Sequence, residues 1–364
     1  MDVTITVIDT IGLRIPFDIG APPPMTHGVP RTHIEGLYIR VATSAGVVGW
    51  GESFGSARPM VIAAFDHWIR RLVVGQSVTD TALMARIERM LLSLGRAGPM
   101  MNALSGLDIA LWDIRGKLEG VPVSTLLGGA KRQRVACYAS LMQYYGNPEY
   151  LKRNIGRALD QGYRWIKLHE RTPEAVAIAR AATGPDIPLM VDTNCAWSLP
   201  DAEVAVAAMA PLKPYWVEEP IYPPEDFEAL AQLRKATGVP LGMGENATSL
   251  RDFRTMVAMG AADFVQPAIV KMGGISALSK VAAQVEQAGA ICVPNAFYVG
   301  PGYLAALHCM AAKEKDAPLE RMFANLAATP FAKTVPIVNA SIEVPRGPGL
   351  GADPEDELIA KYKV

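Results

Sequence analysis

From residue 134 to about residue 323, short apolar runs alternate with longer stretches in which apolar residues recur every three or four positions. The short runs are typical of buried strands, and the longer stretches are typical of amphipathic helices. Strands that alternate with helices build a parallel sheet, and eight such units suggest closure into a barrel. We interpret the following runs as its strands: VACYAS, RWIKLH, PLMVD, YWVEE, PLGMG, DFVQP, AICVP and LERMF.

The pattern before the barrel differs, which indicates a second domain. Residues 3–15 and 35–55 alternate polar and apolar positions, as strands of an antiparallel sheet do, and two amphipathic helices follow before residue 96. A chain of 364 residues has room for a barrel of about 250 residues and a companion domain. We therefore predict an α/β protein with an α+β domain over residues 1–130 and a (β/α)8 TIM-type barrel over residues 131–325.

Charge and composition favour a small-molecule partner. The 35 basic residues nearly balance the 36 acidic ones, so the chain has no strong field for nucleic acid. No apolar run approaches the roughly 18 residues of a membrane span, and the first residues lack a signal-peptide pattern, so we expect a cytoplasmic protein without membrane contact. The 4 cysteines lack CxxC spacing, which argues against a zinc knot and a disulfide framework.

Three carboxylates stand at the carboxyl ends of three consecutive predicted strands: Asp192 in LMVDTN, Glu218 in YWVEEP and Glu245 in GMGENA. Strand ends of this kind converge on one mouth of a barrel, so the three side chains should point at one spot. Three anions together are tolerable only around a cation, and hard oxygen ligands suit Mg²⁺ better than zinc. Strand alternation lets only one of Glu218 and Glu219 enter the mouth, and the pattern does not choose between them.

Two basic groups stand one strand earlier. Lys167 and His169 lie two positions apart in WIKLH, so strand geometry puts them on one face beside the expected metal. A lysine near Mg²⁺ and a second basic group should have a lowered pKa, and a histidine titrates near neutrality, so either is a candidate base. A structural ion pair with a neighbouring carboxylate is the alternative interpretation of Lys167.

In these motifs and in several others, the chain resembles the mandelate racemase subgroup of the enolase superfamily. The resemblance rests on ALSGLDIALWDIRGKLEGVPVSTLLGG, on the WVEEP and GMGEN strand ends, and on the closing PGLGADPEDELIAKY, and it extends from end to end. It implies a capping α+β domain over the barrel mouth, completed by the C-terminal segment 326–364. It also implies a homo-oligomer.

When the family's metal ligands are carried over by position, the resemblance implies that Asp192, Glu218 and Glu245 bind Mg²⁺. It therefore implies that Glu218, and not Glu219, enters the barrel mouth. Lys167 matches the lysine that binds the substrate carboxylate, and His169 stands where the family has a second catalytic lysine. Glu320 resembles the acid that hydrogen-bonds the enediolate formed after proton removal; a surface acid beside Arg321 is the alternative.

The departures from the family pattern narrow the reaction. Ala268 occupies the place of the sixth-strand aspartate or lysine, and the seventh strand end, VPNAFYVGPG, has no histidine. A racemase needs a base on each face of its substrate, whereas dehydration needs only one base that takes the α-proton and then protonates the leaving hydroxyl. We therefore expect a Mg²⁺-dependent lyase, a dehydratase that converts a hydroxylated carboxylic acid, such as a sugar acid, to a 2-keto acid.

Three alternatives stay open: a racemase, epimerase or cycloisomerase on the same scaffold, a Schiff-base aldolase that uses Lys167 or Lys271, and a barrel that binds an acid without turnover. A proline-stiffened loop at residues 21–27 is a candidate lid. The side chains that we assign to substrate binding are His27, His33, Asn194, Lys271, Asn295 and Tyr298.

Overall fold

The computed structural model describes residues 2–26, 28–331 and 337–364. Eight parallel strands form the sheet of the larger domain, in the hydrogen-bonded order β12, β11, β10, β9, β8, β7, β6, β13. Each coincides with one of the eight runs identified in the sequence, and the carboxylates of Asp192 and Glu218 lie side by side in the register of neighbouring strands. Their bounds are β6 (Arg134–Leu141), β7 (Ile166–Leu168), β8 (Leu189–Asp192), β9 (Trp216–Glu218), β10 (Leu241–Met243), β11 (Phe264–Val265), β12 (Ile291–Cys292) and β13 (Leu319–Phe323).

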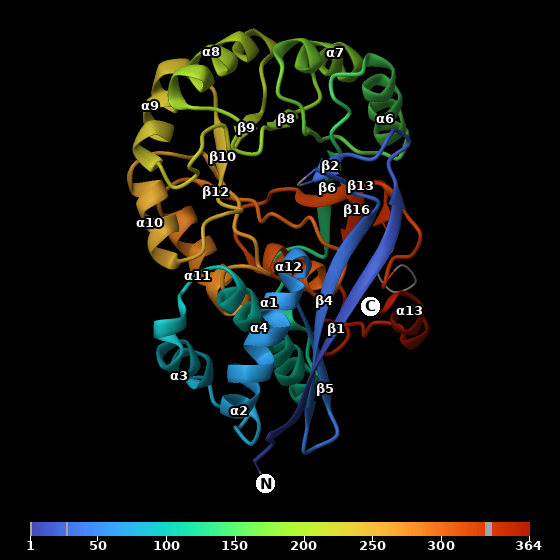
Figure 1. The fold of residues 1–364 in the computed structure, drawn as a ribbon, viewed down its shortest axis with the longest axis vertical. Coiled ribbons are helices and arrows are strands. Elements are labelled where there is room, and N and C mark those ends of the chain that lie inside the picture. Colours follow the sequence, from blue (N-terminus) through green and yellow to red (C-terminus); the bar gives the residue numbers. More distant parts are fainter. Residues whose placement is uncertain (1, 27, 332–336) are drawn as a thin grey trace.

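Helices follow the strands and form the outer layer of this domain (Figure 1). Five of them begin at a side chain that accepts a hydrogen bond from a backbone N–H of the first turn, which satisfies donors that a helix leaves free. These caps are Asn147, Thr172, Ser198, Asp226 and Ser249. The helices are α6 (Pro148–Asp160), α7 (Pro173–Thr183), α8 (Leu199–Met209), α9 (Phe227–Thr237), α10 (Leu250–Ala258), α11 (Gly274–Gln287) and α12 (Pro301–Ala312). The strand and helix order confirms the predicted (β/α)8 barrel.

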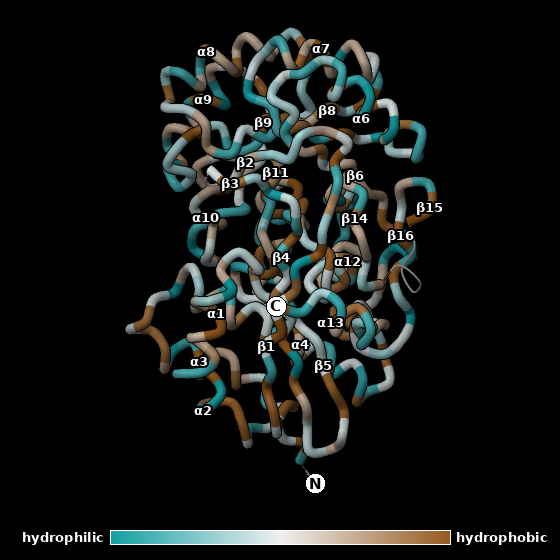
Figure 2. Tube along the Cα trace, turned by 45° about the vertical axis from the view of Figure 1, so that its right-hand side comes forward, coloured by the Kyte–Doolittle hydropathy of each residue, from teal (hydrophilic) through white to brown (hydrophobic). Residues whose placement is uncertain are grey.

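The N-terminal domain, which we call the cap, is built on an antiparallel sheet of β1 (Ile5–Asp18), β4 (His33–Thr43) and β5 (Val48–Phe54). The long helix α4 (Pro99–Glu119) packs on β5, and a side chain at Gly51 would collide with the carbonyl of Gly106. Hydrophobic and hydrophilic residues alternate along these elements, as Figure 2 shows. The remaining cap elements are β2 (Met25–Thr26), β3 (Val29–Pro30), α1 (Arg58–Ala64), a π-helical turn (Phe65–Ile69), α2 (Arg70–Val73), α3 (Leu83–Met90), 3₁₀ turns at Gly55–Ala57 and Leu92–Leu94, and α5 (Val123–Leu126).

The C-terminal segment returns to the cap. The short strand β14 (Asn325–Leu326) pairs with β1, and the backbone N–H of Val364 donates to the carbonyl of Gly12 at 3.0 Å. Between them, β15 (Ile337–Val338) and β16 (Ser341–Glu343) form an antiparallel pair along β6, and α13 (Asp356–Tyr362) precedes the end of the chain. Periodicity did not predict this path, whereas the family resemblance did.

Two buried carboxylates hold the domains and the C-terminal segment together. Glu52 on β5 accepts a hydrogen bond at 2.9 Å from the N–H of Gly302 in the first turn of α12. Asp113 on α4 accepts from the N–H of Trp50 at 2.8 Å, from the N–H of Leu350 at 2.7 Å and from Lys117 Nζ at 2.8 Å. Asp113 therefore joins a cap strand, a cap helix and the C-terminal segment.

No helix among residues 2–26, 28–331 and 337–364 is long and apolar enough to cross a membrane.

Replacement of Asp113 by Ala leaves the ammonium of Lys117 and two buried N–H groups without their shared acceptor. We expect Asp113→Ala to lower the free energy of unfolding by about 3–5 kcal/mol, measured by urea denaturation. The control is Asp9→Ala, which removes the solvent-exposed pair of Asp9 with Arg40 at 2.9 Å and should cost about 1 kcal/mol or less. Equal losses in the two variants would contradict the role of Asp113.

Candidate active site

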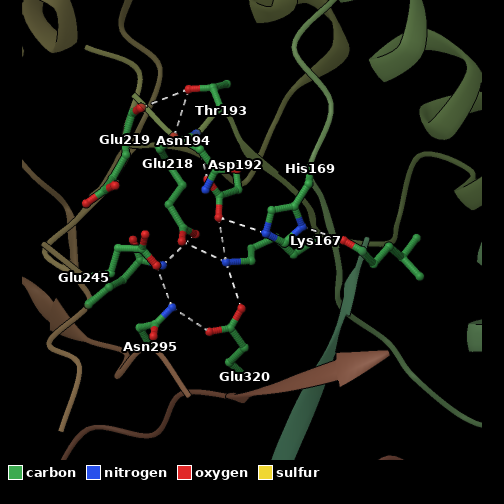
Figure 3. A network of polar contacts seen from close by, with 12 residues as sticks. Lys167, His169, Asp192, Thr193, Asn194, Glu218, Glu219, Glu245, Asn295 and Glu320 are labelled. Atoms are coloured by element: carbon green, nitrogen blue, oxygen red, sulfur yellow. Dashed lines mark hydrogen bonds and ion pairs between the residues drawn. The ribbon is translucent and has the colours of Figure 1, made fainter. Parts of the chain in front are cut away.

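The carboxyl ends of the barrel strands bring one ammonium group among several carboxylates (Figure 3). Lys167, on β7, is 1% exposed, and its Nζ lies 3.0 Å from Asp192 Oδ2, 2.8 Å from Glu218 Oε1 and 2.8 Å from Glu320 Oε1. These partners come from β8, β9 and β13, so three separate strands contribute to the same contact. The structure thus brings together four of the residues that the sequence selected, and Glu320 is buried rather than a surface acid.

The surroundings of Lys167 reverse the pKa shift that the sequence suggested. Burial alone would lower the pKa of this lysine, but the charges of Glu218, Glu320 and Asp192 outweigh burial and raise the pKa well above its ordinary value. Opposite charges at this distance favour the protonated form. In this arrangement Lys167 is held as an ammonium, which suits it to bind an anion.

His169, beyond the end of β7, is oriented at both ring nitrogens. Its Nδ1 lies 2.5 Å from the carbonyl oxygen of Leu141, and its Nε2 lies 3.2 Å from Asp192 Oδ2. A carbonyl oxygen can only accept, so Nδ1 must carry a proton and donate it. Nε2 is consequently the nitrogen that can exchange a proton at this site.

Glu218 and Glu219 point to different places, as strand alternation predicts for neighbouring residues. Glu218 points into the barrel, where Trp216 Nε1 and Gln266 Nε2 donate to its Oε2 at 2.9 and 2.6 Å. Glu219 has a φ of +44°, which ends the strand, and its Oε2 accepts from Asn246 Nδ2 at 2.7 Å. Its Oε1 is buried without a hydrogen-bond partner. Glu218 contacts Lys167, whereas Glu219 lines a separate cavity whose lining includes neither Glu218 nor Lys167.

Asn295 links the remaining two carboxylates. Its Nδ2 donates to Glu245 Oε2 at 2.9 Å and to Glu320 Oε2 at 3.0 Å, and the N–H of Ala296 also donates to Glu320 Oε2 at 2.9 Å. The hydroxyl of Tyr298 donates to the carbonyl of Asn295 at 2.7 Å, which fixes the turn that carries the amide. An amide donates here but cannot act as a base, so Asn295 does not replace the seventh-strand histidine of the family.

The charges of this cluster favour a bound cation. Asp192, Glu218 and Glu320 are buried around one ammonium, and the half-buried Glu245 is linked to Glu320 through Asn295. Burial raises the pKa of Glu218 and of Glu245, with the neighbouring carboxylates adding to the effect, and it raises the pKa of Glu219 to about 8. Within the described residues, no three acidic, histidine or cysteine side chains form a ready cation cage. Lys167 Nζ holds the position between Asp192 and Glu218, so ligation by all three predicted carboxylates requires side-chain adjustment. The oxygen donors themselves fit Mg²⁺.

The cluster forms the floor of a cavity of about 350 Å³ whose roof is the loop of the cap around β2 and β3. Of the residues assigned to substrate binding, Asn194, Lys271, Asn295 and Tyr298 line this cavity. His33 does not line it, and its Nδ1 lies 2.8 Å from the hydroxyl of Thr32; His27 lies outside the described residues.

Sequence reasoning missed several lining residues. Met142 and Gln143 follow the first barrel strand, so the rule that strand ends meet at one mouth could have found them. Phe54 and Phe297 also line the cavity. A larger cavity of about 480 Å³ lies between the cap and helices α10 and α11, but it contains none of the cluster carboxylates. The smaller cavity is therefore the candidate active site.

Known proteins resemble this chain over nearly its whole length. The family description "Mandelate racemase / muconate lactonizing enzyme, N-terminal domain" matches residues 23–128, and "Enolase C-terminal domain-like" matches residues 150–358. The D-galactarolactone cycloisomerase of Agrobacterium fabrum is 31% identical over 92% of each chain. A D-galactonate dehydratase of Ralstonia nicotianae is 30% identical over 89% of this chain and 90% of the relative.

Solved structures agree with this result. A racemase from Streptomyces coelicolor A3(2), solved with bound magnesium, superimposes with a TM-score of 0.88 at 25% identity and covers 99% of this chain and 100% of its own. Cap, barrel and C-terminal segment are thus shared along the whole length. The chain belongs to the mandelate racemase and muconate lactonizing enzyme family of the enolase superfamily.

Proposed function

We propose that this protein is a Mg²⁺-dependent enzyme that removes the proton next to the carboxylate of a sugar acid and eliminates water to give a 2-keto acid. The observation that carries the proposal is the buried contact of Lys167 with Asp192, Glu218 and Glu320, with His169 Nε2 beside it. Fixed positive charge at this point favours the additional negative charge that develops when an α-proton leaves a carboxylate.

Asp192, Glu218 and Glu245 would hold the metal, which supplies positive charge next to the substrate carboxylate. Lys167 stays protonated and donates to that carboxylate from a fixed position. Glu320, held by Asn295 and the N–H of Ala296, points at Lys167 and would keep this ammonium in place beside the enediolate.

His169 Nε2 would take the α-proton, and its Nδ1–H remains bonded to Leu141. The electron pair of the broken C–H bond forms the enediolate. When the C–O bond at the β-carbon breaks, that pair forms the C=C bond, and the proton on Nε2 passes to the departing hydroxyl, which leaves as water. The enol product then becomes the 2-keto acid. One base on one face completes this sequence, which matches the presence of His169 and the absence of an acid at Ala268.

The relatives support both the dehydratase and its alternative. One is a D-galactonate dehydratase and another is a D-galactarolactone cycloisomerase, and both reactions act on sugar-acid derivatives. An isomerase on the same scaffold is therefore the second candidate, and D₂O separates the two, because an isomerase incorporates deuterium at the α-carbon without loss of water. The predicted cytoplasmic location and homo-oligomeric assembly stay predictions.

The assignment of metal ligands is tested by calorimetric titration with MgCl₂ after treatment with EDTA. We expect Asp192→Asn, Glu218→Gln and Glu245→Gln each to weaken Mg²⁺ binding by more than about 10-fold, because loss even of groups that only orient ligands has effects of this size. Glu219→Gln is the matched control, since it neutralises the adjacent glutamate, and it should weaken binding less than Glu218→Gln does. A larger effect of Glu219→Gln than of Glu218→Gln would show that the second glutamate is the ligand.

The role of His169 is tested by the rate of 2-keto acid formation from D-galactonate and other sugar acids. Replacement by Asn should lower kcat/KM by about 100- to 10,000-fold, the usual contribution of a positioned base. His33→Asn, a histidine of the cap outside the cavity, is the control and should leave the rate within about twofold. Undiminished turnover by His169→Asn would assign the base to another residue.

A further inference from the structure

An arginine of the cap lines the active-site cavity together with residues of the cluster. Arg31 follows β3, and its backbone N–H donates to the carbonyl of Pro24 at 2.8 Å, which closes the β2–β3 loop. Its guanidinium carbon lies 5.2 Å from the centre of the Phe297 ring, and both side chains line the cavity. The ring of Phe297 is in turn 6.0 Å from the ring of His169. Phe297 therefore separates Arg31 from the proposed base.

Among the residues that the structure describes, no carboxylate forms an ion pair with Arg31. Among the described residues, its guanidinium makes no hydrogen bond and no ion pair. It forms a cation–π contact with the ring of Phe297. The nearby carboxylate that acts on it is Glu35, but Arg14 Nε and Arg58 Nη1 hold the two oxygens of Glu35 at 2.9 and 3.0 Å. Burial lowers the pKa of Arg31, although Glu35 opposes this shift. A desolvated cation without a partner is unfavourable, and an incoming anion removes that penalty.

The floor of the cavity already provides for one carboxylate. Lys167 and the proposed metal would bind the carboxylate next to the reacting carbon, and Lys271 Nζ is engaged by the carbonyl of Glu245 at 3.1 Å and by Asn246 Oδ1 at 3.4 Å. Lys271 makes these two hydrogen bonds on the barrel side, and its charge acts on Glu245 and Glu219. Arg31 is thus the one lysine or arginine among the described lining residues whose side chain makes neither a hydrogen bond nor an ion pair. A planar guanidinium binds a planar carboxylate through two parallel hydrogen bonds. A single arginine balances the one charge of a carboxylate, whereas a terminal phosphate carries nearly two charges.

We propose that Arg31 binds a second carboxylate at the end of the substrate remote from the reacting carbon, so that the preferred substrate is a sugar diacid and not a monoacid. This inference rests on the proposed function, because it assumes that the first carboxylate lies at the floor. The cap then selects the substrate by charge, and the barrel carries out proton transfer.

The test compares two acids that differ at one position. Galactarate carries a carboxylate at C6, where D-galactonate carries a hydroxymethyl group. Binding of each is measured by calorimetry in MgCl₂, with His169→Asn as the background so that neither acid is consumed. We expect galactarate to bind about 10-fold or more tightly than D-galactonate, the usual effect of a hydrogen bond between charged groups. Arg31→Met should abolish this preference, because it should weaken the binding of galactarate more than the binding of D-galactonate.

Two further variants separate the charge of Arg31 from a general disturbance of the cap. Arg31→Lys keeps the charge without the planar fork and should retain part of the preference. Arg71→Met removes another arginine of the cap, which lies 4.5 Å from the ring of Trp68 outside the cavity, and should retain all of it. Thermal denaturation shows whether each variant is folded. If Arg31→Met does not fold, the preference of Arg31→Lys for galactarate tests the inference instead.

Equal affinity of the His169→Asn background for both acids would overturn the inference, and so would an unchanged preference in Arg31→Met. The proposed function would still hold if the protein binds D-galactonate and the enzyme with His169 converts it. Tighter binding of 6-phosphogluconate than of the diacid would also overturn it, in favour of a phosphate site. Binding of neither acid in MgCl₂ would overturn both the inference and the proposed function.

Discussion

The active site depends on the contact of one buried ammonium with several buried carboxylates. Lys167 reaches Asp192, Glu218 and Glu320 within 3.0 Å, and all four side chains are at most 2% exposed. Burial of like charges without compensation is strongly unfavourable, so such a cluster persists only if cations and hydrogen-bond donors surround it. Trp216, Gln266, Asn295 and the N–H of Ala296 are those donors. These contacts exist only if neighbouring strands keep their register. The arrangement of the active site therefore depends on the packing of the barrel strands.

The two domains divide the work of the site. The barrel supplies the floor, where proton transfer would take place, and the cap supplies the roof, which reaches the other end of a ligand. Glu52 fastens β5 to the first turn of α12, and Asp113 fastens the C-terminal segment to α4. These buried contacts hold the body of the cap rigidly. The β2–β3 loop contacts the barrel domain where the backbone N–H of Met25 donates to the hydroxyl of Tyr145 at 2.8 Å. Specificity can therefore change in this loop without disturbing the cluster.

The sequence predicted the barrel and the strand-end positions of Asp192 and Glu245, because apolar periodicity and strand-end geometry are local properties. The choice of Glu218 over Glu219 came from the family resemblance. The sequence did not predict contacts that depend on the path of the chain after a strand ends. Glu219 follows the end of its strand at a positive φ, and periodicity gave no sign of this turn. The protonated state of Lys167 depends on Glu320, which lies 153 positions away in the chain and was suggested by the family resemblance alone. Arg31 was visible as a loop arginine, but its unpaired charge appears only in three dimensions.

The central claim is that this cluster of carboxylates lacks positive charge and that a divalent cation supplies it. Because the pKa values of Glu218 and Glu245 are raised and that of Glu219 is about 8, the metal-free protein should hold protons that a cation displaces. The most direct measurement is Mg²⁺ binding at pH 7 in buffers of different ionisation enthalpy, which counts the protons released per ion bound. We expect about one proton or more to be released, and fewer at pH 9. Binding with no proton release at pH 7, or no binding of Mg²⁺, would contradict the account.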